Sequence, residues 1–147
     1  MIIRKMTFED LERVVTIENQ CFTDPWSKEG FADSLKQESS ELITAENDEG
    51  EIVGYCCLYF ALDEGEIVNV AVAPECRKKG YGAWMVRRLM DIGIEKGVRQ
   101  FFLEVRASNE AGQKLYNSLG FEVCGMRKGF YTQPKEDAVL MTWSHEA

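Results

Sequence analysis

The sequence contains few of the residues on which several common enzyme classes depend. It has one histidine, His145, close to its end, so a serine or cysteine triad would need that tail to fold back. The five cysteines are odd in number and show no repeated C-x-x-C spacing. This argues against a disulfide framework and, with the single histidine, against a zinc site. We expect no metal, and free thiols that pack as small apolar side chains at Cys21, Cys56, Cys57, Cys76 and Cys124.

Long apolar runs are also absent. The longest, such as residues 67–73, are too short to cross a bilayer, and residues 1–10 lack the basic start and apolar stretch of a signal peptide. We therefore expect a cytoplasmic protein that does not associate with a membrane. The net charge of -8 disfavours direct nucleic-acid binding and suits a basic partner, although solubility explains it equally well.

The composition is typical of one globular domain. Of the 147 residues, 45% are hydrophobic and 29% are charged, a balance that supports a real core. Because no internal repeat or linker interrupts the chain, we expect a single domain over residues 1–147, as a monomer or weak dimer.

Periodicity and turn residues predict strands and helices in the order β-α-α-β-β-β-α-β-α-β-β. Thr7 with Asp10 forms a capping box, Ser27 is a second helix cap, and Gly97 ends a third helix. Strands are expected at residues 2–5, 41–46, 52–62, 66–73, 99–106, 121–131 and 138–143, and helices at 7–22, 27–36, 80–96 and 109–119. Turns are expected at 47–50 and 63–65. This order predicts an α/β protein with a mixed sheet, and its two strand-then-helix units suggest parallel strands side by side in the second half.

The segment between the strand at 66–73 and the helix at 80–96 has the features of a phosphate-binding loop. Arg77, Lys78 and Lys79 supply positive charge, and the first turn of a helix exposes amides that bind anions. Gly80 and Gly82 let the backbone approach a phosphate. A Walker loop does not fit, and neither does a dinucleotide fingerprint, since Met85 replaces its third glycine. An ordinary helix start with surface lysines remains the alternative.

This loop, with Leu103-Glu104-Val105-Arg106-Ala107-Ser108-Asn109 and Leu115-Tyr116-Asn117-Ser118-Leu119-Gly120-Phe121, resembles the GNAT superfamily of acetyl-CoA-dependent N-acetyltransferases. The resemblance extends over nearly the whole chain. It implies a central mixed sheet with helices on both faces and splayed parallel strands at the cofactor site. Residues Arg77, Lys78, Lys79, Gly80, Tyr81, Gly82 and Ala83 stand where that family's Q/R-x-x-G-x-G/A loop holds the pyrophosphate of coenzyme A.

Within the superfamily the chain is most similar to the RimI group, which acetylates the N-terminal alanine of a small-subunit ribosomal protein. Pro25-Trp26-Ser27, Asn69-Val70-Ala71-Val72 and Glu104-Val105-Arg106-Ala107-Ser108-Asn109 carry that similarity. It implies a basic ribosomal protein as the acceptor. Three alternatives stay open: a eukaryotic-type N-terminal acetyltransferase, an enzyme acting on a lysine, polyamine or antibiotic amine, and a coenzyme-A-binding module without activity.

The resemblance also implies roles for single residues. Glu104, near the carboxyl end of a strand and just before a helix start, is expected to act as general base, directly or through a water. Tyr116 is expected to bind the cofactor and protonate the leaving thiolate, although helical spacing from Leu119 is also typical of a core residue. Asn109 is expected to cap its helix and contact the pantetheine arm.

Backbone groups and aromatic side chains complete the expected site. Val70, Ala71 and Val72 are expected to bind the pantetheine chain and the acetyl carbonyl through their backbone, which requires a splayed strand pair and a β-bulge at residues 69–71. Tyr131 and Trp26 are candidates for the wall of the acceptor site, and a core role for Trp26 is an equal alternative.

Overall fold

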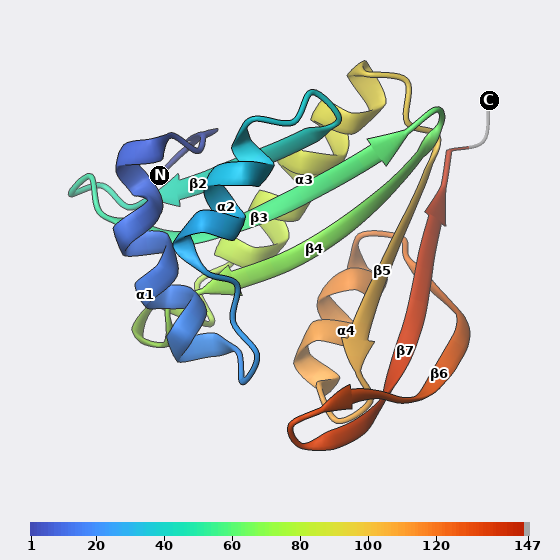
Figure 1. Ribbon diagram of the computed structural model, residues 1–147. Helices are drawn as coiled ribbons and strands as arrows, with labels where there is room; N and C mark the ends of the chain where they lie inside the picture. Colours follow the sequence, from blue (N-terminus) through green and yellow to red (C-terminus); the bar gives the residue numbers. More distant parts are fainter. Residues whose placement is uncertain (146–147) are drawn as a thin grey trace.

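The computed structural model describes residues 1–145, which form one seven-stranded mixed sheet with four helices. The strands are β1 (Ile2–Lys5), β2 (Ser40–Glu46), β3 (Ile52–Ala61), β4 (Glu64–Val72), β5 (Gln100–Arg106), β6 (Glu122–Thr132) and β7 (Lys135–Ser144). The helices are α1 (Leu11–Cys21), α2 (Lys28–Leu35), α3 (Tyr81–Glu95) and α4 (Glu110–Ser118). Figure 1 labels these elements along the chain.

The local signals for helix ends are confirmed. The Asp10 carboxylate accepts hydrogen bonds from the amide and hydroxyl of Thr7, although the chain passes through a short 3-10 turn, Phe8–Asp10, before α1 begins. Ser27 Oγ accepts from the Gly30 amide, and Gly97 follows α3 with a left-handed φ of 98°. Each device gives a partner or a relaxed backbone to a helix end that would otherwise be left unsatisfied.

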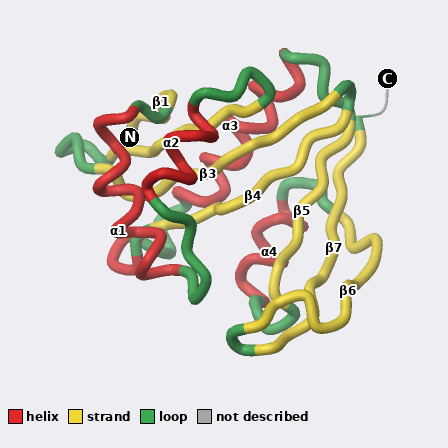
Figure 2. Tube along the Cα trace, viewed as in Figure 1, coloured by secondary structure: helices red, strands yellow, loops and turns green. Residues whose placement is uncertain are grey.

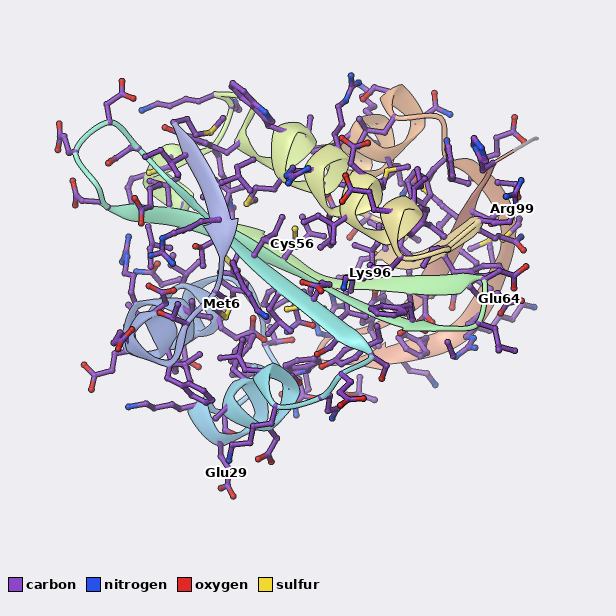
Figure 3. All side chains as sticks on the ribbon, turned by 90° about the horizontal axis from the view of Figure 1, so that it is seen from above. Met6, Glu29, Cys56, Glu64, Lys96 and Arg99 are labelled. Atoms are coloured by element: carbon purple, nitrogen blue, oxygen red, sulfur yellow. The ribbon has the colours of Figure 1, made fainter. Side chains whose placement is uncertain are left out.

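The sheet separates two hydrophobic clusters, with α1 and α2 on one face and α3 and α4 on the other (Figure 3). The labelled Cys56 belongs to the cluster under α3, and the labelled Met6 belongs to the cluster under α1. The pattern follows from the sequence, because the side chains of a strand alternate between the two faces. Helices on both faces were expected and are found. In residues 1–145 no helix has the length and apolarity needed to cross a membrane.

The parallel pair β4 and β5 is joined over only one short stretch. Its ladder runs from Glu64 opposite Gln100 to Glu66 opposite Phe102 and ends there, and the two strands then diverge (Figures 1 and 2). On its other side β4 stays paired with β3 up to Val72, with a register shift where Asn69 adopts a left-handed φ of 52°. Both the splay and the bulge were predicted. The result is a wedge-shaped opening in the middle of the sheet.

The parallel strands expected side by side are found as β4 and β5. The place of the last strands was not predicted: β7 inserts between β5 and β6 and pairs antiparallel with both. Strand β7 pairs with β5 along its whole length, from Gln100 opposite Ser144 to Arg106 opposite Ala138. The turn between β3 and β4 is also tighter than expected, since only Leu62 and Asp63 separate the two strands.

The junction of β3, β4 and α3 leaves no room for a side chain at Gly54. A Cβ there would lie 2.7 Å from the carbonyl oxygen of Ala71 and 2.9 Å from Met85 Cε. We expect Gly54→Ala to lower the free energy of unfolding by about 1–3 kcal/mol, measured by urea denaturation, because a backbone atom of β4 must move. The matched change Gly30→Ala, whose new Cβ would lie 3.5 Å from its nearest neighbour, is expected to stabilise helix α2 by up to about 1 kcal/mol. Equal stability of the two variants would contradict the close packing described at Gly54.

Candidate active site

A cleft of about 610 Å³ occupies the opening between β4 and β5. The helix α1 and the loop that follows it form one wall, and β5, α4 and the β6–β7 hairpin form the other. Six of the residues singled out in the sequence line this cleft together: Trp26, Val70, Glu104, Asn109, Tyr116 and Tyr131. Residues distant in sequence thus meet where the sheet is split.

Glu104 carries the most unusual carboxylate of the cleft. Its Oε2 is buried without a hydrogen-bond partner among the described residues, and its Oε1 lies 3.7 Å from Nη1 of Arg127. Burial raises the pKa of Glu104, Arg127 lowers it, and the nearby charge of Glu66 raises it again. An incompletely solvated carboxylate with a raised pKa has the properties of a proton acceptor at neutral pH.

Tyr116 faces the cleft from α4 and also packs on the core. Its ring makes an edge contact with Phe121 at a centroid separation of 6.1 Å, and burial raises the pKa of its phenol. The core role and the cleft role that the sequence left open are therefore compatible. About two turns earlier, Asn109 Oδ1 accepts from the Gly112 amide at 2.9 Å, which confirms Asn109 as the cap of α4.

Trp26 and Tyr131 approach the cleft from opposite walls. The Trp26 ring packs on Phe31 and Tyr59, with centroids 5.2 and 6.1 Å away, so this residue lines the cleft and also belongs to the packing under α2. The Tyr131 ring lies beneath the guanidinium of Arg106, 4.3 Å from its centroid. The cation–π contact fixes the phenol at the hairpin side of the cleft.

Arg106 of β5 holds the hairpin of its own wall and also reaches the opposite wall, where its Nη2 donates to the Thr23 hydroxyl at 3.4 Å. It donates to the carbonyls of Gln133 and Pro134 at 3.1 and 3.0 Å and forms an ion pair with Glu136 at 3.2 Å. Thr23, in the loop after α1, donates from its hydroxyl to the Gln133 carbonyl. Through these bonds the loop between α1 and α2 meets the tip of the β6–β7 hairpin.

The basic loop lies outside the lining of the cleft, at the start of α3. Lys78 and Gly80 adopt left-handed φ values of 66° and 86°, and no side chain caps the helix, so its first amides remain available to an anion. Arg77, Lys78, Lys79 and Gly80 are exposed, whereas Tyr81 and Ala83 are half-buried. Gly82 has a further role, because a Cβ there would lie 2.9 Å from Leu115 Cδ1 of α4.

Beyond the bulge, the backbone N–H and C=O groups of β4 point alternately toward β3 and toward the split. The Ala73 amide donates to the Val53 carbonyl of β3 at 2.8 Å, and adjacent residues of a strand turn their backbone groups to opposite edges. The groups of Val72 therefore point toward the split, where its carbonyl accepts from Arg77 Nε at 3.2 Å. Val70 lines the cleft. Ala71 is buried, and its backbone faces its partner Tyr55 on β3.

Several cleft residues were not predicted from sequence. Glu18 is the clearest case, a carboxylate 1% exposed on the apolar face of α1. Its spacing of seven residues from Leu11, which places a charge in an apolar stripe, was the signal that could have revealed it. Glu66 and Arg127, which set the charge around Glu104, gave no signal because they come from β4 and β6, far from Glu104 in sequence.

His145 and the cysteines take no part in this cleft except Cys21. The amide of His145 donates to the Arg99 carbonyl, at the end of β5 remote from Arg106, and its ring stacks on Trp143. All five cysteines are free thiols, and Cys56 and Cys57 are buried in the core. Over residues 1–145, no three histidine, cysteine, aspartate or glutamate side chains come together as metal ligands.

Comparison with known proteins places this geometry in a family. The family model described as acetyltransferase (GNAT) family matches residues 11–121. A [ribosomal protein bS18]-alanine N-acetyltransferase from Escherichia coli (strain K12) is 33% identical over 141 residues, which cover 95% of this chain and 94% of that one. A relative from Bacillus subtilis (strain 168), named provisionally for the same reaction, is 35% identical over 95% of this chain and 92% of its own.

The crystal structure of the ribosomal-protein-S18-alanine N-acetyltransferase from Escherichia coli has the same fold. It superimposes with a TM-score of 0.89 at 32% identity, covering 99% of this chain and 95% of that chain. The chain that has this mixed sheet, split parallel pair and basic loop is therefore similar to the Escherichia coli enzyme along nearly its whole length. The protein belongs to the GNAT family and is an N-acetyltransferase.

Proposed function

We propose that this protein is an acetyl-CoA-dependent enzyme of the RimI group that acetylates the N-terminal alanine of the ribosomal protein bS18. The observation that carries the proposal is the 33% identity, over 95% of the chain, to an Escherichia coli enzyme named for that reaction. The cleft supports it, because it brings a half-buried carboxylate with one buried oxygen and a half-buried tyrosine to the split between two parallel strands.

The described residues fit acetyl-CoA as the acetyl donor. The uncapped amides of α3 and the exposed side chains of Lys78 and Lys79 suit the pyrophosphate. The backbone edge of β4 at Val70 and Val72 suits the amides of the pantetheine arm, since the ladder with β5 ends at Glu66. Acetyl-CoA would supply the activated acetyl thioester.

Glu104 would take the proton from the acceptor amine, directly or through a water. An N-terminal amine has a pKa of about 8, compared with about 10.4 for a lysine, so a carboxylate with a raised pKa removes its proton more readily. The orphan Oε2 of Glu104 would receive the hydrogen bond that no described residue supplies. Backbone amides of β4 would stabilise negative charge on the acetyl carbonyl oxygen.

Tyr116 would donate to the departing sulfur. Burial raises the pKa of its phenol, so the hydroxyl stays protonated throughout the neutral range and remains a donor. Its position on α4, about two helix turns from the cap residue Asn109 and beside the core residue Phe121, holds it at one wall of the cleft. A fixed donor lowers the free energy of the transition state more than a mobile one.

The charge of the cleft supports a cationic acceptor. Its lining includes the carboxylates of Glu18, Asp24, Glu66 and Glu104 but the guanidinium of only Arg106, which is already paired with Glu136. A peptide with a protonated terminus and basic side chains near it is attracted to such a cleft. A polyamine shares that charge, so the choice of acceptor has to be tested directly.

The proposed base makes the pH dependence specific. We expect Glu104→Gln to lower turnover about 10²–10⁴-fold. In the wild type, kcat/KM should rise with pH through the raised pKa of Glu104. Arg127→Gln removes a charge that lowers this pKa, so its rising limb should lie at higher pH, and the difference should shrink with added salt because Arg127 is exposed. Lys128→Gln, on the exposed neighbour, is the control; overlapping profiles for both variants and the wild type would count against Glu104 as the base.

An acceptor panel tests the function itself. Thiol release from acetyl-CoA would be followed with a peptide that begins with alanine and basic residues, the same peptide blocked at its N-terminus, a lysine peptide and spermidine. We expect turnover with the free alanine peptide alone. Glu66→Gln should raise KM for that peptide, whereas Glu64→Gln, an exposed residue of the same strand outside the cleft, should not. Activity on spermidine or on the lysine peptide would overturn the proposed acceptor, and silence with all four would leave a binding module.

A further inference from the structure

The cleft contains a buried carboxylate, that of Glu18, which has no part in the proposed proton transfers. Glu18 lies in the last two turns of α1, is 1% exposed, and lines the cleft. No lysine or arginine of residues 1–145 forms an ion pair with it. Burying a charge without a counter-ion is costly, so its hydrogen bonds must offset that cost.

Three donors from three different elements meet at this carboxylate. The Tyr55 hydroxyl of β3 donates to Oε1 at 2.5 Å. The Trp26 amide, in the loop before α2, and Nδ2 of Asn69 donate to Oε2 at 3.0 and 2.8 Å. Glu18 thereby joins the acceptor wall of the cleft to the strand at which the acetyl donor is expected to bind.

The bond to Asn69 has a direct consequence for β4. Asn69 has a φ of 52°, a left-handed conformation that asparagine tolerates better than most residues but that still needs support. It stands at the register shift between β3 and β4, immediately before Val70. A side chain held by Glu18 therefore fixes the bulge, and the bulge determines which way the backbone groups of Val70 and Val72 point.

We propose that Glu18 is a positioning residue with two connections. It fixes the donor-binding backbone of β4 through Asn69, and it fixes the acceptor loop through the Trp26 amide. The inference rests on the proposed function for the identity of the two substrates. The titration of the carboxyl is consistent with this role, since burial raises the pKa of Glu18 while the bonds from Trp26, Tyr55 and Asn69 lower it. The Tyr55 hydroxyl fixes the remaining oxygen, so the carboxylate cannot turn away from either partner.

Two substitutions separate the two connections. Glu18→Met keeps roughly the length of the side chain but removes both carboxylate oxygens, so Trp26, Asn69 and Tyr55 all lose their acceptor. We expect about a tenfold rise both in KM for the alanine peptide and in the dissociation constant for acetyl-CoA, measured by calorimetry. Asn69→Gly tolerates the left-handed φ but removes the bond to Glu18, and should weaken acetyl-CoA alone. Glu12→Gln, an exposed carboxylate on the same helix, is the control and should change neither constant.

The outcome that overturns the inference is a folded Glu18→Met enzyme, by circular dichroism, that has a lower melting temperature but wild-type constants for both substrates. If Glu18→Met does not fold, Asn69→Gly still decides, because unchanged acetyl-CoA binding in that variant removes the connection through the bulge. Failure of the proposed function looks different: the wild type would ignore the alanine peptide, while the effect of each variant on acetyl-CoA binding would still be measurable.

Discussion

The early end of the ladder between β4 and β5 is the constraint on which the rest of the site depends. Three residue pairs hold the two parallel strands together, and beyond Glu66 and Phe102 neither strand has the other as a partner. Strand backbone left unpaired is normally a liability that proteins cover. Here it lines a cleft, with β3 completing β4 on one side and β7 completing β5 on the other, so the sheet stays intact around the opening.

On each wall of this opening, a charged side chain holds neighbouring backbone by hydrogen bonds. Glu18 supports the bulge and the loop after α1, while Arg106 supports the hairpin tip from the opposite wall. Glu104 differs from both because one of its oxygens has no partner among residues 1–145. A polar group left without a bond in an otherwise satisfied network is the one with capacity to act on a ligand.

Local features were predictable from sequence where local chemistry decides them. Thr7, Ser27 and Asn109 were recognised as helix caps because a cap involves residues only a few positions apart. The loop before α3 was recognised from its basic residues and glycines between a strand and a helix, whereas Glu104 and the split between β4 and β5 were implied by the family resemblance. The insertion of β7 between β5 and β6 was missed, because strand order depends on pairings that no local pattern encodes.

Glu18 was missed for a related reason. Its hydroxyl and amide partners, Tyr55 and Asn69, lie 37 and 51 residues away, so only the fold makes a charge on an apolar helix face acceptable. Gly82 is a second example. It was singled out for phosphate binding, but it also allows α3 to pack closely on Leu115 of α4, a contact between helices that are distant in sequence. Sequence patterns thus locate the candidate reacting groups better than the groups that hold them in place.

Amide hydrogen exchange with and without saturating acetyl-CoA tests most directly whether the split strand is the donor site. We expect slower exchange at residues 70–72 of β4 and at 78–82, before and within the first turn of α3, with no change in β2 or in the hydrogen-bonded core of β3. Saturation with acetyl-CoA that leaves residues 70–72 exchanging as fast as in the free protein would contradict this expectation.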